Sequence, residues 1–148
     1  MTITLRSAES VDQPAIRRLV RASGINPMGL AWPHFVVAVT EEGQIIGTGQ
    51  LKPHGDLIEL ASIAVAPDFQ GQGIARLLIE RLLSQAPPEV WLMCESGLMP
   101  LYVKFGFREE LEVARMPRYF QRMRQLVAVF SRLSRSEARL AVMVRRAA

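Results

Sequence analysis

Apolar residues change their spacing along this chain, and each spacing predicts a different element. Residues 57–65 form a nearly continuous apolar run with β-branched members, bounded on both sides by turn residues. That pattern is typical of a buried strand. The apolar residues that follow have the spacing of one helix face: Ile74, Leu77, Leu78, Leu82 and Leu83. The centre of the chain is therefore predicted to be a strand, a glycine-rich turn and a helix.

The same patterns predict elements over the rest of the chain. Further strands are expected over residues 3–7, 35–39, 45–51, 90–94, 107–114 and 138–145. Further helices are expected over residues 12–24, 96–104 and 118–133. Strand 90–94 follows the central helix, so we expect it to lie parallel to strand 57–65 through a right-handed crossover.

These elements predict a fold of the α/β class (α+β), with a mixed, mostly antiparallel central sheet flanked by helices. The 148 residues fit one domain, 1–148, and are enough to bury a core. Hydrophobic residues make up 49% of the chain, yet no apolar run approaches the length of a membrane span, and the first residues do not resemble a signal peptide. Because Cys94 is the only cysteine, we expect a reducing, cytoplasmic location.

The net charge of +4 is distributed unevenly. Residues 1–103 carry 7 Lys+Arg and 10 Asp+Glu, a balance of −3, whereas residues 104–148 carry 11 and 4, a balance of +7. Helix 118–133 holds several of these arginines, largely off its apolar stripe. Such a helix could bind RNA, DNA or an acidic membrane, but a charged helix face is usually only solvated. We therefore expect neither nucleic acid nor membrane as a partner, while the apolar stripe leaves a homodimer open.

The turn Gln70–Ala75 has the properties of an anion site. It joins a strand to the start of a helix, where backbone N–H groups are unpaired and the helix dipole is positive. Gly71 and Gly73 allow a ligand oxygen to approach the backbone. A Walker loop would end in Gly-Lys-Ser/Thr, and a dinucleotide fingerprint would need glycine where Arg76 stands, so neither motif fits. A phosphate or pyrophosphate site and a plain turn without a ligand both remain open.

Two blocks of residues resemble the signatures of a known family. Val65-x-Pro67-x-x-Gln70-Gly71-x-Gly73-Ile74-Ala75-x-x-Leu78 resembles the acyl-CoA-binding motif of the GNAT (Gcn5-related) N-acetyltransferases. Leu101–Phe107 resembles that family's later signature, a tyrosine on a helix followed by Gly-Phe. The blocks have the family's order and separation, and the resemblance is clear from about Phe35 to Phe107. An inserted basic helix within 116–135 departs from the family, which usually has a shorter link there.

The resemblance implies the GNAT acyl-CoA N-acyltransferase fold, in which a splayed parallel strand pair holds acetyl-CoA as cosubstrate. It implies main-chain contacts to the cofactor arm from Ile63, Ala64 and Val65. It also implies phosphate contacts from Gln70, Gly71, Gln72, Gly73, Ile74, Ala75 and Arg76. Tyr102 matches the tyrosine placed to protonate the leaving thiolate. No metal is expected, because two histidines and one cysteine are widely spaced.

Glu59 is the preferred catalytic base. It lies in an otherwise apolar strand, and strand alternation places it on the same face as Ile63 and Val65. An acid there is either a base at the site or a solvated charge at the strand end, and some family members use a glutamate at about this place.

Other residues could replace Glu59 in that role. His34 and His54 could accept a proton, although each is more often a turn or core histidine. Glu95 stands where the family often has an asparagine that contacts the cofactor arm, so that contact is not carried over, and Glu95 could face the acceptor amine instead. A water molecule could also act as the base.

The sequence therefore predicts an acetyl-CoA-dependent N-acetyltransferase. It would transfer the acetyl group to a primary amine of a small molecule or protein, by direct attack on the thioester within a ternary complex. The family resemblance implies that residues 25–33, after the first helix, line the acceptor site. The alternatives are a non-catalytic acyl-CoA-sensing module and an acetyltransferase that associates with protein or nucleic acid through its arginine-rich helix.

Overall fold

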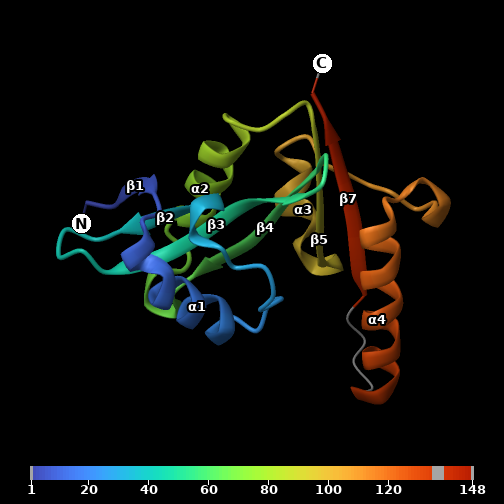
Figure 1. Ribbon diagram of the computed structural model, residues 1–148, viewed down its shortest axis with the longest axis horizontal. Helices are drawn as coiled ribbons and strands as arrows, with labels where there is room; N and C mark the ends of the chain where they lie inside the picture. Colours follow the sequence, from blue (N-terminus) through green and yellow to red (C-terminus); the bar gives the residue numbers. More distant parts are fainter. Residues whose placement is uncertain (1, 135–138, 148) are drawn as a thin grey trace. The chain divides into compact units, whose positions relative to one another are not determined.

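The computed structural model describes residues 2–134 and 139–147 (Figure 1). The chain divides into two compact units. The N-terminal unit comprises residues 1–53 and 59–87, and the C-terminal unit comprises residues 54–58 and 88–148. Each unit has its own strands and its own core. The division into two compact units does not decide whether residues 1–148 form one domain, which stays a prediction.

The strands of the N-terminal unit follow one another across its sheet in chain order. They are β1 (Thr4–Ser7), β2 (Phe35–Val39), β3 (Ile45–His54) and β4 (Leu57–Val65). β1 and β3 both pair with β2 in antiparallel fashion. The last residue of β3 and the first two of β4 are counted with the C-terminal unit.

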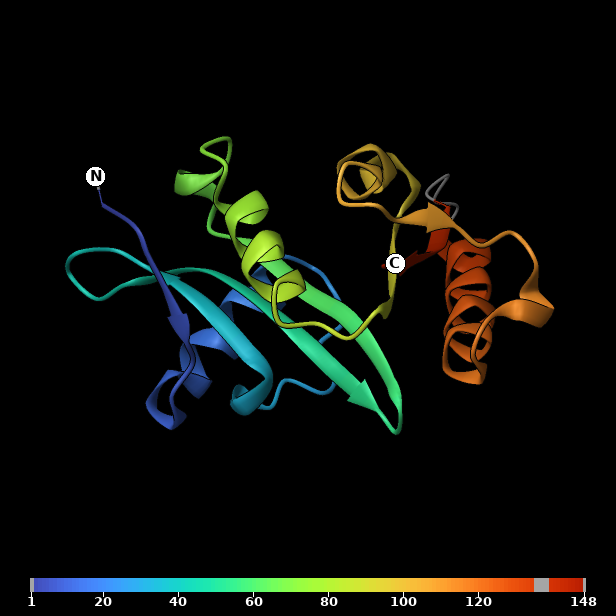
Figure 2. The ribbon, with the colours of Figure 1, turned by 90° about the horizontal axis from the view of Figure 1, so that it is seen from above.

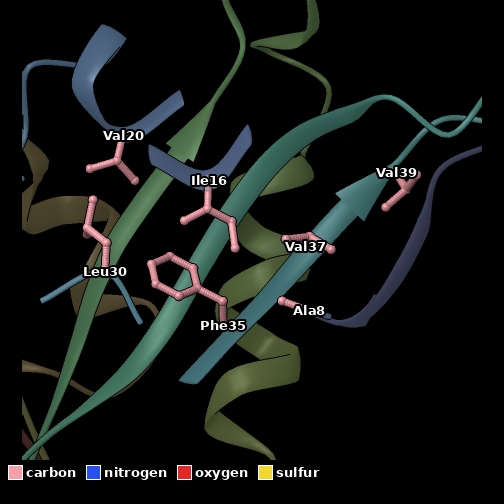
Figure 3. Packing of buried hydrophobic residues seen from close by; sticks show 7 residues of the cluster. All are labelled: Ala8, Ile16, Val20, Leu30, Phe35, Val37 and Val39. Carbon is pink, nitrogen blue, oxygen red and sulfur yellow. The ribbon is translucent and has the colours of Figure 1, made fainter. Parts of the chain in front are cut away.

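Two helices cover opposite faces of this sheet, as Figure 2 shows: α1 (Gln13–Ala22) and α2 (Ile74–Leu83). The α1 face carries alternate residues of β2, which pack with the helix in one core cluster (Figure 3). The buried members of that cluster are Ala8, Ile16, Val20, Leu30, Phe35, Val37 and Val39. The intervening residues of β2 point to the α2 face, since paired residues on neighbouring strands share a face.

Two glycines of β3 allow α2 to approach the sheet closely. A Cβ at Gly49 would lie 2.7 Å from Cδ1 of Ile63 and 2.8 Å from Cδ1 of Leu82. A Cβ at Gly47 would lie 3.0 Å from Cδ1 of Leu78. A side chain at either position would force these packed side chains to shift, so the glycines allow the side chains of α2 to lie directly on the strand.

The C-terminal unit contains β5 (Glu89–Glu95), β6 (Arg108–Glu109) and β7 (Leu140–Arg146), in the order β5-β7-β6. Both pairings with β7 are antiparallel. Its helices are α3 (Met99–Val103) and α4 (Arg118–Ser134). Trp91 of β5 packs in its core cluster with Met116, Phe120, Val142 and Val144.

Most predicted elements are confirmed, but the strand predicted over 107–114 is much shorter than expected. Only Arg108 and Glu109 pair with β7, and the N–H of Glu110 then donates to the carbonyl of Val142 at 2.9 Å. The alternating apolar residues that suggested a strand are exposed, Leu111 at 73% and Val113 at 44%. They face no core, so nothing extends the pairing. The helix predicted over 118–133 is present as α4, whereas residues 135–138 of the predicted break and last strand lie outside the described residues.

No helix in the part of the chain that the structure describes has both the length and the apolar character needed to cross a bilayer.

Candidate functional site

Two glycines between β4 and α2 have a backbone conformation that other residues avoid. Gly71 has φ of 79°, and Gly73, the N-cap of α2, has φ of 81° and ψ of 12°. This is the left-handed region, which only glycine enters without strain. A Cβ at either position would meet no atom within 4 Å. The glycines are therefore required by the backbone and not by packing, and the turn is open to a ligand.

The start of α2 supplies hydrogen-bond donors beside this turn. The N–H of Leu77 donates to the carbonyl of Gly73 at 3.1 Å, so the N–H groups of Ile74, Ala75 and Arg76 precede the first bond of the helix. The helix dipole makes this end positive. The first turn carries no acidic residue, and the exposed Arg76 pairs with Glu80 at 2.9 Å. An anion at this position would meet donors and positive charge.

Gln70 ties the turn to the strand that enters it. Its Nε2 donates to the carbonyl of Val65 at 3.0 Å, across the 3-10 turn Pro67–Phe69. This bond fixes the distance between the end of β4 and the glycines. The ten residues predicted to hold the cofactor, 63–65 and 70–76, therefore lie together at one end of the N-terminal unit.

Ser62 interrupts the extended backbone of β4. Its φ of 60° is the one positive value at a non-glycine among the described residues. A side-chain-bearing residue in this region costs on the order of 1–3 kcal/mol and needs support from its surroundings. Thr48 Oγ1 donates to the Ser62 carbonyl at 2.9 Å, and Gln50 Nε2 donates to Ser62 Oγ at 2.8 Å. The sequence shows no sign of this feature, because a single serine within an apolar run is compatible with a regular strand.

Glu59 is buried on β4, with 4% of its surface exposed. The solvated strand-end charge is therefore excluded, and the carboxylate lies inside the protein. The prediction that Glu59 shares a face with Ile63 and Val65 relied on regular alternation, which Ser62 interrupts between them. Of the other base candidates, His34 and Glu95 are exposed, and His54 is half-buried and stacks on Tyr119 at 3.8 Å.

Tyr102 is buried in the C-terminal unit, on α3. Its ring meets Phe107 edge-on, with centroids 6.1 Å apart, and its carbonyl accepts hydrogen bonds from the N–H groups of Phe105 and Phe107. Gly106, with φ of 91°, makes the tight turn that brings Phe107 back onto the ring. Burial raises the pKa of Tyr102 to about 12, with a smaller contribution from Cys94. The phenol therefore holds its proton at neutral pH.

Buried polar side chains on β3 were not predicted. Thr48 and Gln50 have no exposed surface, and Lys52 is 9% exposed. In the sequence these residues alternate with Gly47, Gly49 and Leu51, which reads as a solvated strand face. The structure instead covers that face with the segment between α1 and β2, to which Gln50 and Lys52 donate hydrogen bonds.

Across residues 2–134 and 139–147, no three His, Cys, Asp or Glu side chains gather as a metal site would require. In the N-terminal unit, β4 leads through an open glycine turn into the N-terminus of α2. That arrangement is typical of proteins that bind a phosphorylated ligand.

The chain belongs to the acetyltransferase (GNAT) family, whose model matches residues 7–107. Over 83 residues it is 36% identical to a mycothiol acetyltransferase from Jonesia denitrificans, an alignment that covers 50% of this chain and 26% of that protein. The chain thus spans only about a quarter of the length of this relative. The expected family is confirmed.

Solved structures of other proteins share the fold. Rv2747 from Mycobacterium tuberculosis, in complex with CoA, superposes with a TM-score of 0.74 at 22% identity, covering 98% of this chain and 99% of that one. N-acetylglutamate synthase from Neisseria gonorrhoeae, complexed with coenzyme A and N-acetyl-glutamate, has a TM-score of 0.73 at 17% identity, covering 100% of this chain and 36% of that one. At these identities the likeness shows the fold, and it confirms the predicted fold class.

Proposed function

We propose that this chain is an N-acetyltransferase that moves an acetyl group from acetyl-CoA to a primary amine, by direct attack within a ternary complex. The observation that carries the proposal is the open turn at the start of α2. There Gly71 and Gly73 leave space where a Cβ would stand, beside the unpaired N–H groups of the helix. Membership of the GNAT family supports acetyl-CoA as the ligand.

The turn and the strand before it would bind the cosubstrate. Acetyl-CoA supplies an activated thioester and a pyrophosphate. The N–H groups from Gly71 to Arg76 suit the pyrophosphate, and the main chain of Ile63, Ala64 and Val65 suits the amide-containing arm. Ser62 changes the direction of the backbone immediately before this segment. An N–H group turned out of the sheet there could stabilise the oxygen of the thioester as negative charge develops on it.

Tyr102 would donate a proton to the leaving thiolate. Its pKa of about 12 lies well above the ordinary value of about 8.5 for a thiol, so in water the proton would stay on the phenol. A thiolate formed in buried surroundings is also desolvated. Desolvation makes the thiolate a stronger base, which favours its protonation by the phenol and suits general acid catalysis.

Glu59 would take the proton from the attacking amine. A carboxylate within hydrogen-bond reach of the amine can accept its proton, and Glu59 is buried on the strand that leads to the cofactor segment. Glu95 and a water molecule are the alternatives. Residues 28–32, which cover the polar face of β3, would line the acceptor side, and the acceptor would be an amine of a small molecule or protein.

The test is an acetyl-transfer screen with the purified chain. Polyamine, amino-acid, antibiotic and peptide amines are offered with acetyl-CoA, and release of free thiol is measured. We expect one amine class to raise thiol release at least about tenfold over the amine-free rate, and Tyr102→Phe to remove most of that increase. Calorimetric binding of acetyl-CoA with no release for any class would make the chain a binding module. The absence of binding would refute the proposal.

A further inference from the structure

Three consecutive carbonyls between α1 and β2 each accept a hydrogen bond from a side chain of another element. Lys52 Nζ donates to Met28 at 2.8 Å, Gln50 Nε2 to Gly29 at 3.0 Å, and Gln13 Nε2 to Leu30. The Gln13 amide also accepts the N–H of Trp32 at 2.9 Å. Residues 28–32, the 28–32 loop, are thus held on the sheet by polar side chains, although Met28 itself is 59% exposed.

Gln50 differs from the other two because its second partner lies outside the 28–32 loop, on β4. Its Nε2 also donates to Ser62 Oγ at 2.8 Å, and Ser62 is the residue with positive φ that precedes Ile63–Val65 on β4. One amide group therefore bonds both the 28–32 loop and the interrupted strand. Its neighbours on the same strand are bonded to one side only: Lys52 to the loop, and Thr48 to the Ser62 carbonyl.

The orientation of the Gln50 amide follows from its partners. The carbonyl of Gly29 can only accept, so the group that faces it must be the NH2. Both of its hydrogens are then used, one on Gly29 and one on Ser62. The Oε1 is buried without a hydrogen-bond partner among the described residues. An unsatisfied buried acceptor is unfavourable, whereas an apolar residue would avoid this cost but remove the bonds to Gly29 and Ser62. Gln50 instead connects the 28–32 loop to Ser62 of β4.

We propose that Gln50 is a positioning residue that couples the 28–32 loop to the strand segment 62–65. This rests on the proposed function, in which residues 63–65, directly after Ser62, bind acetyl-CoA and the loop lines the acceptor side. Acetyl-CoA that binds along 63–65 fixes Ser62, and Ser62 fixes the Gln50 amide and with it the carbonyl of Gly29. Cosubstrate binding therefore orders the acceptor loop, and acceptor affinity rises when acetyl-CoA is bound, by reciprocal coupling.

The contacts of β3 provide a matched set of variants. Gln50→Met keeps an unbranched chain of similar volume and removes both bonds. Lys52→Met removes the loop bond alone, and Thr48→Val removes the strand bond alone. Ser62→Ala keeps the bond of Gln50 to Gly29 and removes its other end. It serves as a second test of the link if Gln50→Met does not fold.

Amide hydrogen exchange of the whole chain tests the link, first without ligand. We expect Gln50→Met to speed exchange at least about tenfold in both 28–32 and 62–66. Lys52→Met should do so only in 28–32, and Thr48→Val only in 62–66. If Gln50→Met changes one segment alone, the link does not exist. This arm needs no ligand, so it is independent of whether the chain binds acetyl-CoA.

The second arm adds acetyl-CoA at saturation. In the wild-type chain we expect slower exchange in 62–66 and also in the 28–32 loop. In Gln50→Met the loop should lose this protection, while the acetyl-CoA Kd changes less than about threefold. In Ser62→Ala, compared at saturating acetyl-CoA, the loop should lose it as well. Loop protection that persists in both variants, or that is absent in the wild type with acetyl-CoA bound, would overturn the coupling. Failure of acetyl-CoA to bind the wild type would overturn the proposed function, and the ligand-dependent part of the coupling with it.

Discussion

Gly73 holds the backbone conformation on which the proposed cofactor turn depends. Asp and Asn both tolerate the left-handed region better than other side-chain-bearing residues, and they have nearly the same size. Gly73→Asp and Gly73→Asn therefore differ mainly in charge. We predict that Asp weakens acetyl-CoA binding at least about tenfold relative to Asn, or roughly 1.4 kcal/mol, because it places a negative charge at the pyrophosphate. Calorimetry on the two folded variants measures this, and equal affinities would exclude the turn as the anion site.

Tyr102 is predicted to contribute to turnover and not to cosubstrate binding. Tyr102→Phe removes the proton donor and keeps the ring that packs against Phe107. Turnover should fall on the order of 10²–10⁴-fold, as is typical for general acid catalysis, with the acetyl-CoA Kd nearly unchanged. Rates are measured where the chemical step limits turnover. A variant that works at the wild-type rate would show that the tyrosine is only structural.

The sequence predicted some of these residues and missed others, for physical reasons. Gly71 and Gly73 were found because their spacing at a helix start implies a special backbone. The conformation of Ser62 was not, because it depends on Thr48 and Gln50 of a neighbouring strand. Contacts between strands do not affect the spacing of apolar residues along the chain, so that spacing cannot predict them. The burial of Glu59 likewise depends on the parts of the chain that cover β4. Its apolar neighbours suggest that the strand is buried, but they do not determine whether Glu59 itself is covered.

At the scale of elements, an ion pair joins β1 to the start of α1. Arg6 binds Asp12 through both guanidinium nitrogens, at 2.7 and 3.1 Å, and the N–H of Glu9 donates to the same carboxylate at 2.8 Å. The hydrogen bond from Arg6 is the main cause that lowers the pKa of Asp12. A lowered pKa contributes stability above the unfolded value of about 3.9, and this is lost as pH falls through the folded value.

We therefore predict that Asp12→Asn destabilises the chain by about 1–3 kcal/mol at pH 7, and that the difference from wild type shrinks in acid. Denaturant unfolding at several pH values measures it. Glu112→Gln is the control, because Glu112 forms an exposed pair with Arg115 at 3.0 Å. Its effect should stay below about 1 kcal/mol. Equal losses in both variants would contradict the role given to the Arg6–Asp12 pair.

The basic helix α4 is predicted to influence the choice of acceptor. Arg118 and Arg122 are exposed near its start, so their charges would attract an acidic acceptor or repel a polyamine. Replacing both arginines with Glu should change the acceptor KM severalfold and leave the acetyl-CoA KM unaltered. The change in the acceptor KM should shrink as salt is added, because salt screens exposed charges. The same reversal at Arg17 and Arg21, exposed on α1, is the matched control. If both double variants behave alike, α4 has no part in acceptor choice.

Elements were predicted correctly where the apolar pattern coincides with burial. The strands over 35–39 and 57–65 and the helix over 74–83 have the expected bounds, because their patterns match the cores that they face. Over 107–114 only Phe107 is buried, whereas Leu111 and Val113 are exposed, and only two residues pair there. The strand from residue 45 continues to His54, because Lys52 is covered by the 28–32 loop, a contact that local spacing does not reveal.

At the scale of the whole molecule, we predict that stability declines in alkali. Burial raises the pKa of Cys94 to about 11 and that of Tyr102 to about 12, whereas in the unfolded chain these groups titrate near 8.5 and 10. Between these values the unfolded chain releases its protons first. The free energy of unfolding should therefore fall as pH rises from about 9 to 12, by less than about 3 kcal/mol for each group.

Thermal unfolding from pH 8 to 11 measures this decline, and Cys94→Ala and Tyr102→Phe should each flatten it. The chain has two tyrosines, so Tyr119→Phe leaves Tyr102 as the only phenol for a direct absorbance titration. An unchanged slope in both variants, or a phenol that titrates near 10, would contradict the prediction.

The place of β7 between β5 and β6 determines the order in which the chain can acquire structure during synthesis. The N-terminal unit has all its residues once Pro87 is made, and can fold while the remainder is still emerging. The C-terminal unit cannot close at that stage. Val142 and Val144, which pack with Trp91, belong to the last strand, and β5 keeps an unpaired edge until that strand arrives. A premature stop just before Leu140 would therefore yield a chain in which the N-terminal unit can complete its core and the C-terminal unit cannot.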